Sequence, residues 1–255
     1  MSEKDDIFET ISIDGFTMSV YKNDNCISEC LRKGQFWDKQ YFDAYDKLYV
    51  RGKDILDVGG FIGTNTLLFS KLLSEGNKIH TFEPLYHECL EKNIKNNNLG
   101  DKVELHKYGL SNINGKISYK RKDLSKHVGN YGGNMLVFLG GESLESKRLP
   151  EDTDEENVDL RTLDSLGLDN IGFIKMDVEG FEKLVLEGGL ETIKKSNYPP
   201  MHIEIWPPLE NDWRTETPRA RKHYTETRDG IFKMMVDMGY KVVGHAGWDY
   251  LFKHF

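Results

Sequence analysis

The strongest constraint on the fold is a regular alternation of strand and helix patterns in the middle of the chain. Apolar runs typical of buried strands cover residues 54–58, 78–83 and 102–109, and helical patterns separate them at residues 64–76 and 85–98. Strands that alternate with helices of this length form βαβ units with parallel strands and right-handed crossovers. The sequence therefore predicts an α/β domain with a mostly parallel sheet and helices on both faces.

A glycine-rich loop follows the first of these strands, in the sequence DILDVGGFIGTN (residues 54–65). Gly59, Gly60 and Gly63 permit backbone conformations that other residues avoid, and they let a ligand lie against the main chain. Ligands of open α/β sheets bind beyond the carboxyl ends of the strands, where the next helix also offers free N–H groups. We therefore expect a ligand site here; the alternative is a turn that binds nothing.

The spacing of the glycines discriminates between cofactors. A dinucleotide site needs G-x-G-x-x-G, but Phe61 and Thr64 stand where further glycines would be needed, and no Gly-Lys-Ser/Thr follows for a P-loop. Glu83 ends the second strand and can accept hydrogen bonds from both hydroxyls of a ribose. A ribose partner and an acidic residue before the glycines fit S-adenosylmethionine, which carries no phosphate. The predicted cofactor-binding residues are Asp57, Gly59, Gly60, Phe61, Gly63, Asn65, Glu83, Pro84 and Asp177.

Acidic residues follow two later strands of the predicted sheet. In IKMDVEGFE (residues 174–182), an extended chain places Asp177 and Glu179 on one side at the carboxyl end of a strand. Glu204, in MHIEIW, approaches the same end of the next strand. We expect the three carboxylates to converge beside the glycine loop. Such carboxylates repel one another unless they share a cation or a proton.

This group supplies the predicted catalytic residues, Asp177, Glu179 and Glu204. They would bind the acceptor, and one of them would remove a proton from its hydroxyl. A divalent cation such as Mg²⁺ is a candidate partner of Asp177 and Glu204. Two simpler interpretations stay open: Glu179 could bond the backbone at the start of the next helix, and Lys175 could pair with Asp177.

Four segments together, DILDVGGFIGTN, HTFEP, TLDSL and IKMDVEGFE, resemble the FkbM family of S-adenosylmethionine-dependent methyltransferases. The resemblance runs from about Gly34 to the C-terminus. It implies the class I methyltransferase fold, a Rossmann-like, seven-stranded, mostly parallel sheet with an antiparallel last strand. It also implies O-methyl transfer, often to sugars or small hydroxylated metabolites, and a cofactor cap formed by GQFWD (residues 34–38). One departure is Gly60-Phe61, where the family more usually has Ala-Asn.

The other segments complete the predicted organisation. We expect an N-terminal hairpin and helices, residues 1–50, packed on a methyltransferase domain, residues 51–255. Alternating residues around Asp14-Gly15 predict the hairpin. The later pattern predicts a hairpin at 111–122, a solvated acidic loop at 150–157, a strand at 171–178, a helix at 182–196, a strand at 201–206, a charged segment at 210–228, a helix around 230–239 and two antiparallel strands at 240–255.

Composition narrows the partners and the location. A formal net charge of −8 argues against a nucleic-acid partner. No apolar run approaches the length of a membrane span, and the N-terminus is too polar for a signal peptide. Three cysteines, an odd and low count, point to a reducing compartment, so we expect a cytoplasmic protein.

A small-molecule acceptor, a sugar or a nucleotide sugar, is the expected partner; the sequence does not determine the oligomeric state. A phosphate on that acceptor would give a role to cations in a segment that could close over the cleft, Arg214, Arg219, Arg221, Lys222 and His223. The alternative for this segment is a solvated surface. Two rival functions remain, a nicotinamide-dependent oxidoreductase and a methyltransferase fold that binds ligands without chemistry.

Overall fold

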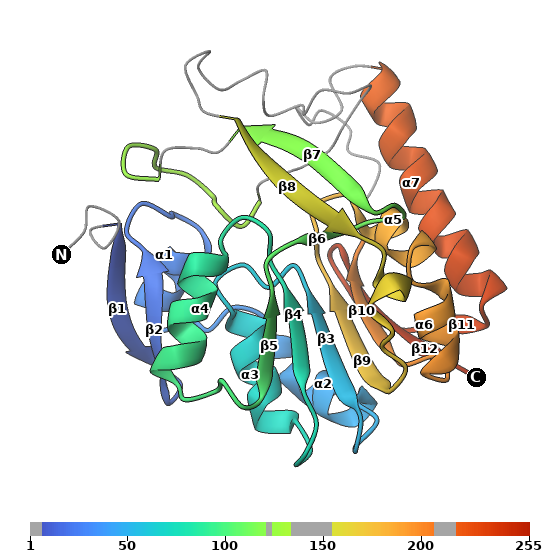
Figure 1. The fold of residues 1–255 in the computed structure, drawn as a ribbon, viewed down its shortest axis with the longest axis horizontal. Helices are drawn as coiled ribbons and strands as arrows, with labels where there is room; N and C mark the ends of the chain where they lie inside the picture. Colours follow the sequence, from blue (N-terminus) through green and yellow to red (C-terminus); the bar gives the residue numbers. More distant parts are fainter. Residues whose placement is uncertain (1–6, 121–123, 134–154, 207–217) are drawn as a thin grey trace.

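A seven-stranded sheet forms the centre of the protein in the computed structural model, which describes residues 7–120, 124–133, 155–206 and 218–255 (Figure 1). Its strands lie in the order β11-β12-β10-β9-β3-β4-β5. Their bounds are β3 Asp54–Val58, β4 Ile79–Phe82, β5 Val103–His106, β9 Ile171–Met176, β10 Met201–Glu204, β11 Tyr240–Ala246 and β12 Asp249–His254. β12 pairs antiparallel with both β10 and β11, whereas β10, β9, β3, β4 and β5 are parallel. The predicted sheet and its antiparallel last strand are confirmed.

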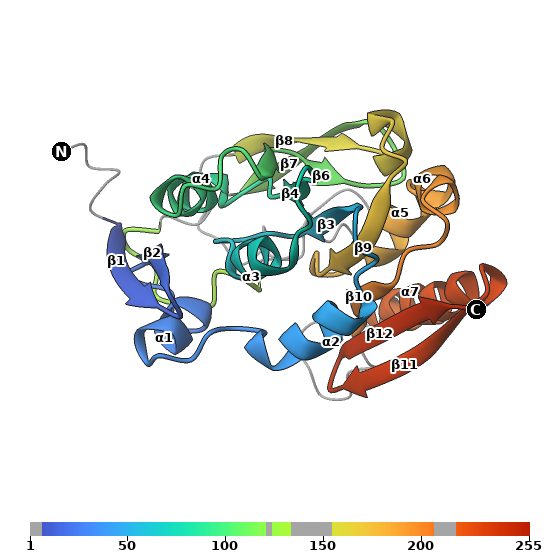
Figure 2. The same cartoon turned by 90° about the horizontal axis from the view of Figure 1, so that it is seen from below.

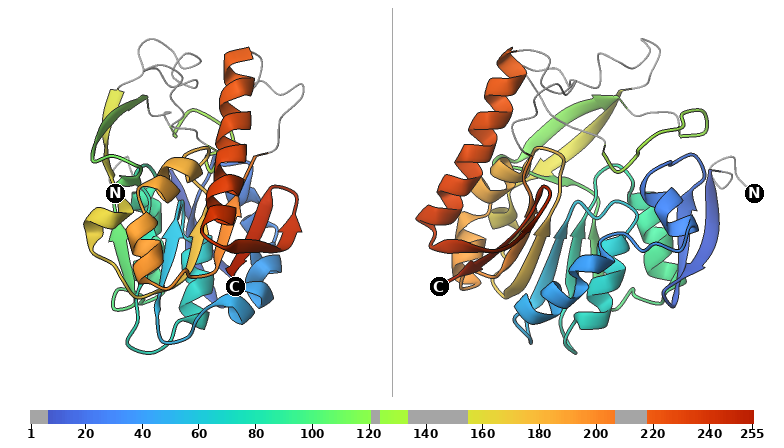
Figure 3. Two further views of the ribbon diagram at one scale, coloured as in Figure 1. Left: turned by 90° about the vertical axis from the view of Figure 1, so that its right-hand side faces the viewer. Right: turned by 180° about the vertical axis from the view of Figure 1, so that it is seen from behind.

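Both faces of the sheet are covered, which explains why its inner strands are apolar runs instead of alternating sequences. Every residue of β4 and β9 is buried. Ile55 packs with α3 (Thr64–Leu72), α4 (His87–Asn96) and α2 (Phe42–Leu48) on one face. Leu56 packs with α5 (Glu182–Glu187), α6 (Leu190–Lys195) and α7 (Pro218–Asp237) on the other. Figures 2 and 3 show α2 and α3 on the side of the sheet opposite α5 and α6. No helix in the described part of the chain is long and apolar enough to cross a bilayer.

A second, three-stranded sheet replaces the hairpin expected at residues 111–122. β8 (Glu155–Arg161) lies between β6 (Gly109–Leu110) and β7 (Gly115–Lys120), parallel to the first and antiparallel to the second. The hairpin prediction was wrong because β7 pairs with a strand far along the chain and not with its neighbour. The solvated acidic loop was also wrong at its described end, since residues 155–157 belong to β8; residues 150–154 lie outside the described part.

The predicted N-terminal hairpin is confirmed: β1 (Phe8–Ile13) pairs antiparallel with β2 (Phe16–Tyr21) across the turn at Asp14-Gly15. α1 (Ile27–Arg32) and the short 3-10 helix η2 (Lys39–Tyr41) connect this hairpin to α2. β2 packs against α4, and its side chains join the same hydrophobic cluster as the helices on that face of the large sheet. The division of the chain at residue 50 stays a prediction.

Two helices differ from the expected ones. The helix expected at 182–196 is broken into α5 and α6 at Gly188-Gly189. A side chain at position 188 would place its Cβ 2.0 Å from the carbonyl oxygen of Ser111, so the chain approaches another backbone there. α7 begins at Pro218, earlier than expected, and takes in part of the charged segment at 210–228. Proline suits the first turn of a helix because the N–H that it lacks would have no helical partner.

Asn93 on α4 connects the N-terminal hairpin to the glycine loop. Its side chain accepts a hydrogen bond from the N–H of Ser19 at 2.6 Å. It donates to the carbonyl oxygens of Ser19 at 2.9 Å and of Ile62 at 2.8 Å. All of these groups are buried, so an apolar replacement leaves several polar atoms without partners.

Replacing Asn93 by alanine is therefore expected to lower the free energy of unfolding by about 2–4 kcal/mol. Lys95→Ala is the matched control, because Lys95 is exposed on the same helix. It should change stability by less than about 1 kcal/mol. Urea denaturation of the two variants measures the difference, and similar losses would show that Asn93 does not hold the hairpin to the loop.

Candidate functional site

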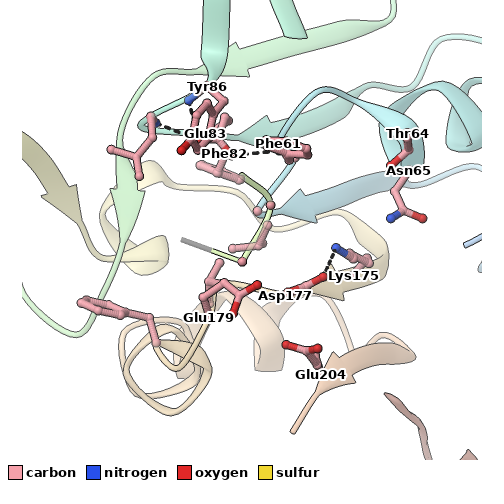
Figure 4. Close-up of a pocket in the computed structure, with 18 of the residues that line it drawn as sticks. Phe61, Thr64, Asn65, Phe82, Glu83, Tyr86, Lys175, Asp177, Glu179 and Glu204 are labelled. Atoms are coloured by element: carbon pink, nitrogen blue, oxygen red, sulfur yellow. Dashed lines mark hydrogen bonds and ion pairs between the residues drawn. The ribbon is translucent and has the colours of Figure 1, made fainter. Parts of the chain in front are cut away.

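A cavity of about 590 Å³ opens at the carboxyl ends of β3, β4, β9 and β10. The strand order reverses here: β4 and β5 extend the sheet on one side of β3, and β9 and β10 extend it on the other. Ligands of open α/β sheets usually bind at such a point. Figure 4 shows Phe61, Glu83 and Tyr86 on one side of it and Lys175, Asp177, Glu179 and Glu204 on the other. Of the predicted site residues, Gly59, Gly60, Phe61, Asn65, Glu83, Pro84, Asp177, Glu179 and Glu204 line the cavity.

The start of the glycine loop lies in close contact with the chain after β9 and with β4. Gly59 has φ 89°, and a Cβ there would lie 1.8 Å from the carbonyl oxygen of Asp177. A Cβ on Gly60 would lie 2.3 Å from Oγ1 of Thr81. The N–H groups of both glycines donate to the carbonyl oxygen of Phe82, each at 3.0 Å. Bare backbone therefore forms this wall of the cavity because side chains have no room.

Phe61 occupies the next position with a left-handed backbone, φ 46°. Asparagine adopts this conformation far more readily than a bulky residue, so Phe61 stores strain where the family more usually has Asn. Aromatic packing offsets it: the ring contacts Tyr86 edge-on, with centroids 5.1 Å apart, and Tyr21 at 6.3 Å. Its side chain is buried, and the residue closes one end of the cavity.

Glu83 fixes the loop to the turn after β4. Its Oε2 accepts the N–H of Phe61 at 2.8 Å, and its Oε1 accepts those of Leu85 at 2.7 Å and Tyr86 at 2.9 Å. Burial raises the pKa of Glu83, although the three N–H groups oppose that shift. Two carboxylate oxygens offer about four acceptor positions, so one remains for a ligand hydroxyl. Glu83 is thus first a structural anchor, which the sequence did not predict.

Asp57 and Gly63, both predicted cofactor contacts, are not among the residues that line the cavity. Gly63 is the N-cap of α3, with φ 93°. Asp57 is fully buried behind the loop, where its Oδ2 accepts a hydrogen bond from Oγ1 of Thr66 at 2.5 Å. Its Oδ1 has no hydrogen-bond partner among the described residues. Burial raises the pKa of Asp57 to about 6, opposed by the cation of Lys175. In these positions Asp57 and Gly63 support the loop, and their direct contact with the cofactor stays a prediction.

Asp177, Glu179 and Glu204 do converge, with one carboxylate oxygen of each within 4.8 Å of the others. Lys175 lies beside them, its Nζ 3.1 Å from Oδ2 of Asp177, so the predicted ion pair is confirmed. Burial opposes the charge of Lys175, but the carboxylates of Asp177, Asp57 and Asp38 more than compensate and raise its pKa. Burial and the charges of Asp177 and Glu179 raise the pKa of Glu204 well above its ordinary value.

The capping role considered for Glu179 belongs to Glu182 instead. Oε1 of Glu182 accepts the N–H groups of Val178 at 2.9 Å and Gly180 at 3.2 Å, just before α5. Glu179 has φ 54°, so the extended conformation assumed for this segment ends before it. The turn, and not strand alternation, directs Glu179 into the cavity.

Two lining residues outside the βαβ units carried little signal in the sequence. Asp38 lies in the GQFWD segment and accepts a hydrogen bond from Nδ2 of Asn65 at 2.8 Å. Burial raises the pKa of Asp38. Trp248, in the turn between β11 and β12, lines the cavity from the far edge of the sheet. Only the family resemblance pointed to GQFWD, and nothing in the sequence pointed to Trp248.

The cavity has a strong excess of negative charge. Among the described residues that line it, Lys175 is the only lysine or arginine. The acidic lining residues are Asp38, Glu83, Asp177, Glu179 and Glu204. A cationic ligand gains from this environment, whereas a phosphate group would be repelled. Arg221, Lys222 and His223 lie in α7, and the side chains of Arg214 and Arg219 lie outside the described part.

Comparison with known proteins gives a family and a fold. Residues 57–242 match the family model of the methyltransferase FkbM domain. None of the curated proteins compared with the chain matches it significantly.

Solved structures with a similar fold have low sequence identity to this chain. Methyltransferase FkbM from Methylobacillus flagellatus is 17% identical, with a TM-score of 0.48; the match covers 84% of this chain and 49%, about half, of that one. A Corynebacterium glutamicum protein is 9% identical, with a TM-score of 0.51 over 88% of this chain and 84% of its own. An O-methyltransferase from Bacillus cereus is 13% identical, with a TM-score of 0.46 over 84% and 78%. The strand order and the antiparallel β12 are those of the class I methyltransferase fold.

The close approach at Gly59 gives a direct test of the loop. Gly59→Ala is expected to lower the free energy of unfolding by about 3 kcal/mol or more, because the added Cβ meets backbone that cannot move aside. Gly76→Ala is the matched control: its φ is 82°, but nothing lies within 4 Å of the added Cβ. That control should cost only about 1–2 kcal/mol, from the left-handed backbone alone. Equal losses in urea denaturation would contradict the close approach.

Proposed function

Because the chain belongs to the FkbM methyltransferase family, we propose that it transfers the methyl group of S-adenosylmethionine to a hydroxyl of a small molecule, a sugar or glycan. The observation that carries this proposal is a single cavity that holds bare glycine backbone, Glu83 and three convergent carboxylates. The glycine loop and Glu83 supply cofactor recognition, and the carboxylates supply proton removal.

The residues present fit this cofactor. Gly59 and Gly60 line the cavity as bare backbone, since a Cβ on either one would collide with Asp177 or Thr81. Oδ1 of Asn65 is buried without a hydrogen-bond partner among the described residues, and Asn65 lines the cavity, so it can accept from an ammonium group. Glu83 has one acceptor position left for a ribose hydroxyl. The acidic lining suits the sulfonium and ammonium of S-adenosylmethionine and disfavours the pyrophosphate of a nicotinamide cofactor.

The other predicted cofactor residues have secondary roles in this proposal. Pro84 lines the cavity beside Glu83 and supplies apolar surface. Asp57 and Gly63 act from behind the loop: Asp57 through Thr66, and Gly63 by starting α3. Asp38 joins them through its hydrogen bond to Asn65, which fixes the side chain that faces the cofactor.

S-adenosylmethionine, when bound, supplies an electrophilic methyl group for in-line displacement by the acceptor oxygen. The protein must place that oxygen and take its proton. Glu204 is best suited to take it, because its raised pKa makes its ionised form a stronger base than an ordinary glutamate. Asp177, paired with Lys175, and Glu179 then bind the acceptor hydroxyls.

The acceptor we favour is a neutral, hydroxylated molecule such as a sugar. Carboxylates accept hydrogen bonds from sugar hydroxyls, and Trp37, Phe181 and Trp248 add apolar surface to the lining. A nucleotide sugar stays a second candidate only because the cations of α7 could bind its phosphate groups. A divalent cation such as Mg²⁺, held by Asp177 and Glu204, would relieve the repulsion among the carboxylates and lower the pKa of the acceptor hydroxyl.

Cofactor class is tested by equilibrium binding. The wild-type chain should bind S-adenosylhomocysteine and should show no saturable binding of NADH. Glu83→Gln should weaken S-adenosylhomocysteine about tenfold or more, since it replaces a charged acceptor that holds both the loop and the ribose. Glu91→Gln, on the exposed side of α4, should leave the affinity unchanged. Preferential binding of NADH would reject the proposed cofactor.

Asp177→Asn and Glu204→Gln should each lower methyl transfer about a hundredfold or more, with affinity for S-adenosylhomocysteine within about threefold of wild type. The assay follows radiolabelled methyl transfer to a panel of neutral sugars and nucleotide sugars. Loss of cofactor binding in these variants would mean that the roles are misassigned. No transfer to any acceptor by wild type that binds the cofactor would favour the non-catalytic alternative. Turnover unchanged by EDTA would remove the cation from the proposal.

A further inference from the structure

A second group of ligand-type side chains lies on the sheet, outside the cavity lining. His80 of β4 faces Glu104 of β5 in the parallel register, and Phe82 faces His106. Because side chains alternate along a strand, all four lie on the same face of the sheet. That face belongs to the cluster containing Leu56 and Phe82, opposite α3 and α4. Among the described elements, Figure 1 shows no helix in front of β4 and β5.

The ligand atoms of this group have the separations of a metal site. Nδ1 of His80 is 3.3 Å from Nε2 of His106. Glu104 places Oε2 3.5 Å from Nδ1 of His80 and Oε1 3.8 Å from Nε2 of His106. A tetrahedral zinc ion with bonds of about 2.0–2.1 Å holds its nitrogen ligands roughly 3.3–3.4 Å apart.

We infer that His80, Glu104 and His106 form a binding site for one divalent transition-metal ion with the ligand preferences of Zn²⁺. Two imidazoles and a carboxylate give three protein ligands, and solvent would take the fourth position. The donor set is richer in nitrogen than the carboxylates of the cavity, which suit a harder ion such as Mg²⁺. The two sites therefore differ in the metal that they prefer.

The outer nitrogen of each imidazole also has a partner, as in known metal sites, where such contacts fix the ring and its tautomer. Nε2 of His80 lies 3.6 Å from Oδ2 of Asp54, whose Oδ1 accepts the N–H of Lys78 at 2.8 Å. Nδ1 of His106 lies 3.0 Å from the hydroxyl of Tyr108. When the outer nitrogens carry the protons, Nδ1 of His80 and Nε2 of His106 present facing lone pairs. A cation between them satisfies both.

The site is pre-formed and open to solvent on one side. The His80 and His106 side chains are only 6% and 13% exposed, whereas that of Glu104 is 58% exposed. The buried imidazoles are held in place, since the His106 ring stacks on Phe82 with centroids 4.4 Å apart. Glu104 can swing by the few tenths of an ångström that coordination needs, and the ion enters from its side.

Metal binding would brace the edge of the large sheet. β5 is its terminal strand, and the carbonyl oxygen of His106 accepts the N–H of Glu83 at 3.0 Å. An ion shared by β4 and β5 therefore stiffens the strand pair from which Glu83 projects. It stabilises the folded protein because the separated strands of the unfolded chain do not form the site.

The test uses the full chain without an affinity tag, stripped of metal and titrated with ZnCl₂. We expect one Zn²⁺ per chain at this site and a melting temperature that rises with Zn²⁺ concentration. His106→Phe keeps the stack on Phe82 but removes the nitrogen. Glu104→Gln is the variant least able to disturb folding, because that side chain is exposed. Each should weaken Zn²⁺ about tenfold or more.

His245→Phe is the matched control, since His245 also stacks on an aromatic ring, that of Tyr250 at 4.3 Å, but has no place in the site. It should bind Zn²⁺ as wild type does. Asp177→Asn should also retain this Zn²⁺. Undiminished binding in both His106→Phe and Glu104→Gln, or no Zn²⁺ bound by wild type, would overturn the site. Loss confined to Asp177→Asn would place the ion in the cavity and overturn it too. No methyl donor is present, so the result is independent of the proposed function.

Discussion

The approach of two backbones at Gly59 is the constraint on which the rest of the site depends. The loop after β3 lies against the carbonyl of Asp177, just after β9, because Gly59 has no side chain to separate the two backbones. This contact sets the distance between the cofactor wall and the carboxylates. Glu83 closes the same wall from the other side through the N–H of Phe61. The ends of β3, β4 and β9 thus form one side of the cavity, and a shift of any one of them would change its width.

Charge is the second organising factor. Parallel strands end together, so the acidic residues at the ends of β9 and β10 must share one low-dielectric space. One lysine, Lys175, neutralises part of that charge. Burial and the remaining repulsion raise the pKa of Glu204. Such a site favours a bound cation, because repulsion among the carboxylates destabilises the folded protein. Folding stability and ligand affinity are therefore linked through the same carboxylates.

The sequence predicted what local patterns determine. β3 begins and ends where DILDV does, and the alternation predicted the parallel strands of the sheet. The count of seven strands with an antiparallel last strand came from the family resemblance, and the closing pair of strands agreed with it. Contacts between distant segments were missed. β7 pairs with β8 across more than thirty residues, and no local signal encodes that choice. Asp57 precedes the glycines as expected, yet only the packed structure shows it behind the loop. Either Glu179 or Glu182 could have accepted the backbone N–H groups before α5 as far as the sequence shows. In the structure Glu182 accepts them, and the left-handed backbone at Glu179 turns that residue away.

Phe61 connects the glycine loop to the N-terminal hairpin, which lies outside the segments that resemble the family. Its ring packs on Tyr86 beside the cofactor wall and on Tyr21 of the N-terminal hairpin. Tyr131 joins the same cluster by contacting both tyrosines. A change from Asn to Phe at this position would destabilise the fold without those rings, because of the left-handed backbone. Without Phe61, in turn, Tyr21 and Tyr86 would lose a packing partner that they share. The hairpin and this variant of the loop are therefore expected to be inherited together, so a relative with Asn at this position should carry a different hairpin.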